Sequence, residues 1–278
     1  MRLCTFVADD GKRAGVIEGD RVLDVGEDLL TLVGEGVEAI ARRRDAATRT
    51  HPVAEVRLLA PLPRPGKFLH LGLNYADHAV ETHLEVPRAP VLFPKWANSV
   101  IGTGEAIVIP EGMVQVDYEA ELAFVVGRRL RHVSGDEALA GVFGYTAVDD
   151  VSERHYQFLT SQWTAGKAID TFGPMGPVLV TPDELEDPDA VPVRCYVNGE
   201  LVQDGNTRNL IFPVERILAF VTRFMTLEPG DVISTGTPTG VQHGRANPRW
   251  LVPGDVVRVE IPGIGALENP VTAERGDG

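Results

Sequence analysis

Three carboxylates alternate along one short stretch, Asp117-Tyr-Glu119-Ala-Glu121, ahead of an apolar run that ends at Val126. In an extended strand, side chains two residues apart point to the same face, so these carboxylates would crowd together. Like charges so placed repel one another unless a cation lies among them. With no cysteine or histidine beside them, oxygen ligands suit a hard ion such as Mg²⁺, Mn²⁺ or Ca²⁺. An exposed acidic strand face is the alternative that this segment leaves open.

A second acidic pair, Asp149-Asp150, stands at the end of a strand-like segment (144–148) and directly before a predicted helix. A carboxylate in that place can complete a three-carboxylate metal site, although aspartate is also among the commonest N-caps of helices. Arg154 and Gln157 follow Asp150 at spacings of four and seven residues. These spacings place both on one helical face, within reach of a common ligand.

Three further segments carry residues suited to catalysis or binding. His78 and Glu81 are three residues apart and can meet on one helical turn, where the carboxylate raises the basicity of the imidazole, as a water-activating base requires; a surface pair is the alternative. Lys167 lies among small and apolar residues and can be half-buried beside an anion, although most lysines face water. Thr237 belongs to a hydroxyl-rich turn whose N–H and O–H groups can hold a carboxylate, or which is only a turn.

Composition excludes several classes of function. The 278 residues include 26 basic and 40 acidic side chains, for a net charge of −14, so we expect neither a nucleic-acid nor a membrane partner. Two cysteines are too few for a disulfide scaffold, and the sequence lacks the serine-hydrolase elbow, the P-loop, the dinucleotide fingerprint and the zinc-peptidase spacing. The start carries no signal-peptide pattern, which predicts a cytoplasmic protein.

The pattern of elements that must position these residues predicts a mixed α/β, β-rich chain. A proline-rich connector, 61–66, separates a small N-terminal α+β domain (1–60) from a main domain (67–275). The first domain is predicted to contain strands over 2–7, 13–18 and 21–25, a hairpin turn at Gly19-Asp20, and one or two helices over 29–44. The main domain is predicted to contain strands over 67–71, 106–109, 119–126, 178–180, 193–197, 231–235 and 256–261, and helices over 135–140, 153–161 and 213–224. Without βαβ alternation, sheets folded into a roll or sandwich are favoured.

In chain order, these segments resemble the fumarylacetoacetate hydrolase (FAH) family. The resemblance is carried by residues 72–78, 90–95, 117–122, 144–154, 163–167, 197–200, 206–207 and 227–238. It implies an FAH-type β-sandwich roll behind a small N-terminal domain, usually as a homodimer. It also implies one Mg²⁺ or Mn²⁺ per chain, bound by Glu119, Glu121 and Asp150, with Asp117 outside the ligand set.

The same resemblance implies roles for the remaining candidates. Lys167 matches the active-site lysine of the family, and His78 with Glu81 matches a catalytic pair that some members carry on a lid. The side chains that would bind the substrate are Arg154, Gln157 and Thr237.

The resemblance implies an enzyme for a small keto or enol acid, which would chelate the ion while the metal stabilises an enolate. Because His78 and Glu81 are both present, we expect hydrolysis of a C–C bond in an acylpyruvate-like β-diketo acid, with Glu81 activating water through His78 and Lys167 supplying positive charge. Such a reaction belongs to the catabolism of aromatic or related compounds. The alternatives are isomerisation or tautomerisation of 2-hydroxymuconate-type dienoates, decarboxylation of oxaloacetate-like acids, and a non-catalytic protein stabilised by metal.

Overall fold

The computed structural model describes residues 1–278 except 10, 27, 82–84, 186 and 276–278, and the side chains of residues 78–80 are also outside the description. The chain is rich in strands and poor in helix, as its sequence predicts. No helix within the described ranges has both the length and the apolar character needed to cross a membrane.

The larger sheet has twelve strands within the described residues. Its main path runs in the order β4 (Thr50–Pro52), β3 (Arg21–Gly26), β2 (Gly11–Glu18), β1 (Arg2–Ala8), β14 (Gly173–Val180), β12 (Val142–Asp149), β11 (Ala120–Val126), β17 (Val232–Ser234), β6 (Phe68–Gly72) and β7 (Val91–Lys95). Two short strands lie off this path, β5 (Arg57–Leu59) beside β1 and β8 (Val100–Ile101) beside β14.

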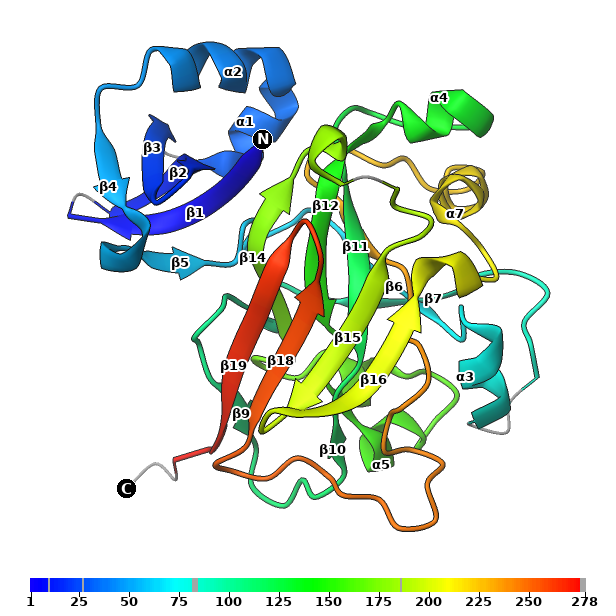
Figure 1. Cartoon of the computed structure of the whole chain (residues 1–278). Helices are drawn as coiled ribbons and strands as arrows, with labels where there is room; N and C mark the ends of the chain where they lie inside the picture. The colour runs from blue at the N-terminus through cyan, green and yellow to red at the C-terminus, as the bar shows by residue number, and fades with distance from the viewer. Residues whose placement is uncertain (10, 27, 82–84, 186, 276–278) are drawn as a thin grey trace.

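A second sheet packs against the larger one, so that the main domain is a sandwich (Figure 1). Its strands run in the order β16 (Glu200–Asn206), β15 (Pro192–Val197), β18 (Val256–Ile261), β19 (Gly265–Ala273) and β9 (Ile107–Ile109). Alternation in β18 buries Val257, Val259 and Ile261 against the other layer, while Arg258 on the opposite face is exposed.

Strand β11 is the centre of the molecule, and all seven of its residues are buried. Leu122 and Phe124 on one face belong to the core between the two sheets, whereas Ala123 and Val125 on the other face belong to a second core. Glu121 shares the face of Ala123, so its carboxylate lies on the side of the sheet away from the sandwich core.

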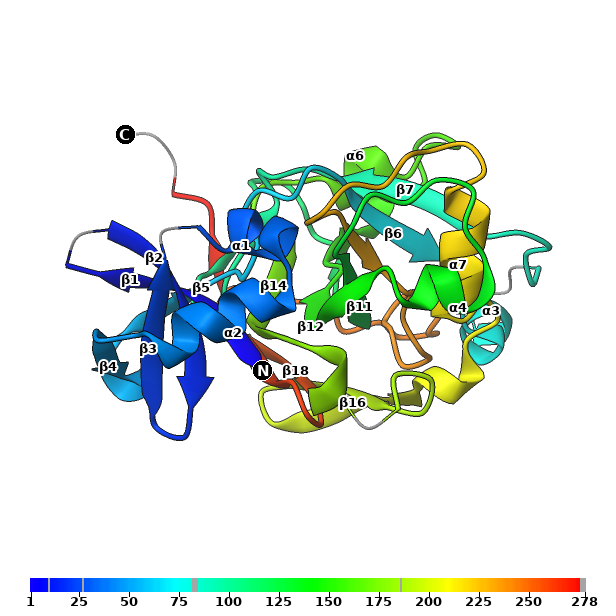
Figure 2. The ribbon, with the colours of Figure 1, turned by 90° about the horizontal axis from the view of Figure 1, so that it is seen from above.

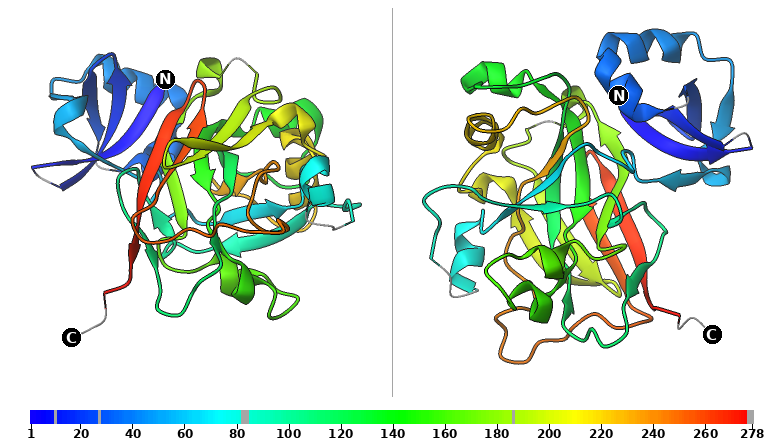
Figure 3. Two further views of the ribbon diagram at one scale, coloured as in Figure 1. Left: turned by 60° about the horizontal axis from the view of Figure 1, so that its bottom comes forward. Right: turned by 180° about the vertical axis from the view of Figure 1, so that it is seen from behind.

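Short helices cover the ends and edges of the sheets, as the views from above and behind show (Figures 2 and 3). In chain order they are α1 (Leu29–Glu35), α2 (Val37–Asp45), α3 (Ala76–Glu81), α4 (Gly135–Leu139), α5 (Arg154–Gln157), α6 (Thr164–Lys167) and α7 (Val214–Val221), with 3₁₀ turns at Val53–Glu55, Pro182–Glu184 and Thr207–Asn209. Helix α1 begins where the sequence predicts, because the carboxylate of Asp28 accepts the N–H groups of Leu30 and Thr31.

The N-terminal strands form their own antiparallel meander, with α1 and α2 packed beside it (Figure 2). The meander joins the main sheet through a short ladder between β1 and β14, in which Arg2 pairs with Val180 and Leu3 with Leu179. The predicted boundary at 61–66 falls between β5 and β6.

Two local predictions are wrong. Residues 117–121 do not form one continuous strand, because β10 (Val116–Asp117) ends before β11 begins, and β10 pairs instead with β13 (Ser152–Glu153). The helix predicted over 153–161 spans only Arg154–Gln157, and its N-cap is Glu153, which accepts the N–H of Tyr156. Neither member of the 149–150 pair caps that helix.

We expect Gly166→Ala to destabilise the junction between α5 and α6. A Cβ at this position would lie 2.3 Å from the backbone N of Gln157 and 2.4 Å from the backbone O of Glu153, so α6 and Lys167 must shift. The free energy of unfolding should fall by about 1–3 kcal/mol in urea titrations, with activity falling alongside it. Gly34→Ala is the control, since the nearest atom to its Cβ would be 3.9 Å away and alanine is the better helix former. Equal stability of the two variants would contradict the expectation.

Candidate active site

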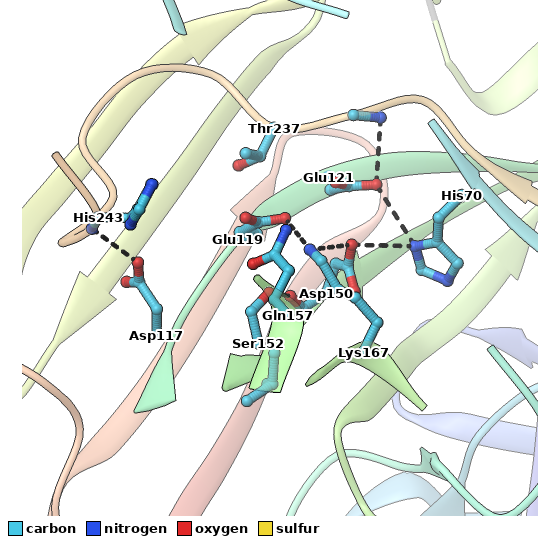
Figure 4. Close-up of polar contacts among 12 residues, drawn as sticks. His70, Asp117, Glu119, Glu121, Asp150, Ser152, Gln157, Lys167, Thr237 and His243 are labelled. Carbon is cyan, nitrogen blue, oxygen red and sulfur yellow. Dashed lines mark hydrogen bonds and ion pairs between the residues drawn. The ribbon is translucent and has the colours of Figure 1, made fainter. Parts of the chain in front are cut away.

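A group of buried ionisable side chains lies where β11, β12, α5 and α6 meet (Figure 4). Each is 5% exposed or less: Lys95, Asp117, Glu119, Glu121, Asp149, Asp150, Arg154 and Lys167. This burial excludes the alternative of an exposed acidic strand face. The group contains more carboxylates than cations, so its charge favours a bound cation.

Lys167 occupies the middle of this group. Its Nζ lies 2.7 Å from Glu119 Oε2 and 2.8 Å from Asp150 Oδ2, and 4.9 Å from the centre of the Phe93 ring. Lys167 therefore lies beside anions, as the sequence suggests, but at 2% exposed it is fully buried and not half-buried. Burial opposes its charge, but Asp150 and Glu119 outweigh this effect and raise the pKa of Lys167, so the side chain is an ammonium.

Asp150 lies between two ammonium groups. Lys95 Nζ is 2.9 Å from its Oδ1, and Lys167 contacts its Oδ2. Although burial opposes ionisation, the two lysines hold the pKa of Asp150 well below its usual range. The neighbouring Asp149 turns the other way and accepts the N–H of Glu119 at 2.8 Å, and burial raises its pKa to about 7.

His70 joins this group and is absent from the sequence prediction. In the register of the sheet, His70 on β6 lies beside Ser234 on β17, and Ser234 lies beside Ala123 on β11. His70 and Ser234 therefore lie on one face of neighbouring strands, and Glu121, two residues before Ala123, lies on the same face of β11 but one pair further along. Ser234 Oγ and the N–H of Gly236 both donate to Glu121 Oε2.

The donor set fits a divalent cation. One ligand atom from each of His70, Glu121 and Asp150 lies within 4.8 Å of the others, and all three residues are buried. Glu121 Oε1 and both ring nitrogens of His70 are buried without a hydrogen-bond partner among the described residues. Unpaired buried donors and acceptors are rare unless an ion or a ligand completes them.

Glu119 lies next to this triad. Its two oxygens are held by Arg154 Nη1 at 2.6 Å and by Lys167 Nζ at 2.7 Å. Its part in the predicted ligand set with Glu121 and Asp150 stays a prediction.

Arg154 and Gln157 meet as their spacing predicts, with Arg154 Nη1 donating to Gln157 Oε1 at 2.9 Å. Asp117, on the separate strand β10, faces Arg154 and the chain at 242–243 rather than the carboxylates of β11. Its Oδ2 accepts from Arg154 Nε and Nη2 at 3.0 and 2.8 Å. Asp117 therefore fixes the orientation of the guanidinium and leaves Nη1 for Glu119 and Gln157. Burial opposes the charge of Arg154, but Glu119 and Asp117 outweigh this effect and raise its pKa.

A pocket opens above this cluster, with a cavity of about 30 Å³. Its lining includes Glu119, Arg154, Gln157, Lys167 and Thr237, together with aromatic and apolar residues and His243. Thr237 Oγ accepts from Gln203 Nε2 at 2.8 Å and donates to Ala120 O at 3.0 Å, so its hydroxyl already has partners.

The predicted pair of His78 and Glu81 lies on α3. The carboxylate of Glu81 accepts the N–H of Gly240 at 3.0 and 3.1 Å, which ties α3 to the chain that follows Thr237 in the pocket wall. The side chain of His78 is outside the described residues.

Sequence reasoning missed three residues of the site. His70 and Lys95 each stand in apolar strands, where a single polar residue carries little signal, although Lys95 lies in a segment that bears the family resemblance. His243 stacks on Phe158 at the pocket with ring centres 4.8 Å apart. It comes from the segment 242–250, whose composition is typical of a loop that borders a substrate or an interface, but the sequence pattern assigned no role to the histidine itself.

The sandwich with its buried carboxylate–lysine cluster defines a β-rich enzyme. The chain belongs to the fumarylacetoacetate hydrolase family: residues 67–272 match the model described as "Fumarylacetoacetate (FAA) hydrolase C-terminal", and residues 1–61 match the model "Rv2993c-like, N-terminal". The resemblance seen in the sequence is thereby confirmed.

Similar proteins within this family carry different activities in their names. A mitochondrial oxaloacetate tautomerase of Xenopus laevis is 46% identical over 220 residues, which are 78% of this chain and 69% of that protein. The solved fumarylacetoacetate hydrolase of Exiguobacterium antarcticum is 40% identical with a TM-score of 0.87, covering 99% of this chain and 100% of that one. The 2-hydroxyhepta-2,4-diene-1,7-dioate isomerase of Mycobacterium marinum is 34% identical with a TM-score of 0.81, covering 99% of each chain.

Replacing the predicted carboxylate ligands should weaken metal binding while the chain still folds; Asp150→Asn should also lower the free energy of unfolding, because it removes the charged partner of the buried Lys95. We expect Glu119→Gln, Glu121→Gln and Asp150→Asn each to lower the affinity for Mn²⁺ by at least about tenfold, because an amide lacks the charge that attracts the ion. Titration calorimetry of the chelator-stripped protein measures the affinity, and circular dichroism checks the fold. The exposed Glu200→Gln is the matched control. Unchanged Mn²⁺ affinity in Glu119→Gln would remove Glu119 from the ligand set.

Proposed function

We propose that this enzyme uses a divalent ion, Mg²⁺ or Mn²⁺, to stabilise the enolate of a small 2-oxo acid, and that it interconverts the keto and enol forms of an oxaloacetate-type dicarboxylate. The observation that carries the proposal is the Lys167 ammonium, which lies between Glu119 and Asp150 on the floor of the pocket, beside the His70–Glu121–Asp150 triad. Positive charge at this point stabilises an oxygen that becomes negative.

Each residue around the pocket has a separate role in the proposed reaction. A bound divalent ion supplies Lewis acidity to the 2-oxo group. Lys167 keeps its proton, because its pKa is raised, and provides a fixed positive charge for the enolate oxygen. Gln157 accepts from Arg154 through Oε1, so its N–H groups are the donors directed to a substrate carboxylate. His78 and Glu81 move the proton between carbon and oxygen.

One observation favours keto–enol transfer over cleavage. The similarity to an oxaloacetate tautomerase extends over 78% of this chain.

Hydrolysis of an acylpyruvate is the second candidate, and the position of Glu81 favours it. The Glu81 carboxylate accepts the N–H of Gly240, three residues beyond the pocket residue Thr237, and in this candidate mechanism it supports His78 as a base for water. In this reaction the water oxygen bonds to the acyl carbon, the C–C bond breaks, and its electron pair becomes the pyruvate enolate that Lys167 stabilises. A role in aromatic catabolism, a homodimeric assembly and a cytoplasmic location belong to the same proposal.

Metal removal followed by a substrate panel tests the function. We expect chelator-stripped protein to be inactive, and Mg²⁺ or Mn²⁺ to restore the decay of enol-oxaloacetate absorbance, because the enolate needs the Lewis acid. The panel also contains acetylpyruvate, fumarylpyruvate and a 2-hydroxymuconate-type dienoate. Metal-dependent release of pyruvate plus a free acid would replace tautomerisation by hydrolysis, and loss of CO₂ from oxaloacetate would replace it by decarboxylation. No metal-dependent turnover of any substrate would overturn the proposal.

The proton-transfer role of α3 makes a separate prediction. Glu81→Gln still accepts the N–H of Gly240 but cannot raise the basicity of His78, so kcat should fall by about 100-fold or more. Mn²⁺ affinity and thermal stability should stay at the wild-type values, since Glu81 lies outside the metal triad. Wild-type kcat in this variant would contradict the role.

A further inference from the structure

His70 is held rigidly at the centre of β6. The strand pairs with β7 on one side and β17 on the other, where His70 lies opposite Phe93 and Ser234. Its imidazole is 0% exposed and lies between the rings of Phe68 and Phe93, at centroid distances of 4.4 and 5.5 Å. Pairing on both edges and aromatic contacts leave the ring little freedom to turn.

The ring is directed at the carboxylates but does not form a standard hydrogen bond with them. Nδ1 lies 3.5 Å from Asp150 Oδ2 and 3.8 Å from Glu121 Oε2, and Figure 4 shows it facing both. Neither Nδ1 nor Nε2 has a hydrogen-bond partner in the described part of the chain. Neighbouring ligands of an octahedral ion bound at about 2.1 Å lie about 3 Å apart, so both distances exceed first-sphere spacing by less than about 1 Å and a small movement toward an ion would complete it.

From this arrangement we propose that His70 contributes a nitrogen ligand, Nδ1, to the divalent ion of the site, and that this ligand makes the site prefer Mn²⁺ to Mg²⁺. The inference rests on the proposed metal-dependent function and goes beyond it by naming the ligand that selects the ion. The sequence suggested oxygen ligands alone, which would give a hard-ion site with little such preference. Imidazole changes that balance, because it suits transition metals whereas Mg²⁺ prefers carboxylates, carbonyls and water.

The competing interpretation is that His70 is only a core residue, packed between two phenylalanines. The N-terminal unit contains a natural comparison, His51, whose ring packs on Phe6 at 5.3 Å and whose Nε2 is also buried without a partner among the described residues. His51 lies on β4, outside the cluster. The pair His70→Leu and His51→Leu therefore separates loss of a ligand from loss of an imidazole that packs on a phenylalanine, although His51 is only half-buried.

The experiment is pulsed electron paramagnetic resonance of the full chain, stripped of metal and loaded with Mn²⁺ alone. We expect directly bound nitrogen to produce ¹⁴N modulation of the Mn²⁺ echo, which changes to the ¹⁵N pattern when the histidines are ¹⁵N-labelled and disappears in His70→Leu. His51→Leu should keep the wild-type signal. Calorimetric competition should show the preference for Mn²⁺ over Mg²⁺ falling by about tenfold or more in His70→Leu only.

The outcomes separate this inference from the function beneath it. Mn²⁺ bound to the wild type without histidine modulation, or an unchanged Mn²⁺/Mg²⁺ ratio in His70→Leu, would overturn the role of His70 while leaving a metal enzyme. Failure of the wild type to bind Mn²⁺ at all would overturn the metal-dependent function itself. If His70→Leu does not fold, His70→Gln with the labelled wild type decides the question.

Discussion

The ammonium of Lys95 is the interaction on which the site depends. Fully buried at the end of β7, it donates to the carbonyls of Val151, Lys167 and Phe172 and lies 2.9 Å from Asp150 Oδ1. These partners come from the turn after β12, the end of α6 and the residue before β14. Burial lowers the pKa of Lys95 while Asp150 opposes this, and three carbonyl acceptors require the three protons of the charged form. Such a charge is tolerable in a core only when every partner is in place. The lysine thus fixes Asp150 and the backbone that carries Lys167 relative to each other.

A second buried group, the carboxylate of Asp117, does the same for the wall of the pocket. It accepts two N–H groups of Arg154 and the backbone N–H groups of Gln242 and His243. Glu81 binds the same loop at Gly240. The loop at 240–243 is therefore held by two carboxylates from separate segments, and the orientation of Arg154 toward Gln157 depends on one of them. The charged groups proposed to act on the substrate and the charged groups that hold the loop in place therefore form one continuous network.

Periodicity was sufficient to predict much of the fold. Alternation located β11, β15 and β18, and the Gly19-Asp20 turn located the hairpin between β2 and β3, because these features follow from local sequence. It failed for β16, which is polar and lies at a sheet edge, and for β19, which contains a proline. Such strands form because neighbours pair with them, and local pattern does not report that.

In the candidate site too, some features follow from local sequence and others depend on which strands pair. Lys167 beside the carboxylates, and Arg154 beside Gln157, follow from residue type and spacing. The separation of Asp117 from Glu121 does not, since it needs the break between β10 and β11. His70 is one polar residue in an apolar strand, and only the register across β17 brings it to Glu121. These features could not be predicted because the local sequence does not show which strands are neighbours in the sheet.

The short ladder between β1 and β14 has a consequence for how the molecule meets other chains. Along the main path of the sheet, β14 is the last strand of the main domain on this side. Without β1 its edge would be open, and its unpaired N–H and C=O groups could bind any extended peptide. The start of β1 occupies part of that edge through Arg2 and Leu3, and the meander beyond it continues the sheet outward to the three-residue strand β4. The N-terminal unit thus prevents other chains from adding a strand at this edge, because the sheet now ends in a strand too short to pair stably with another chain.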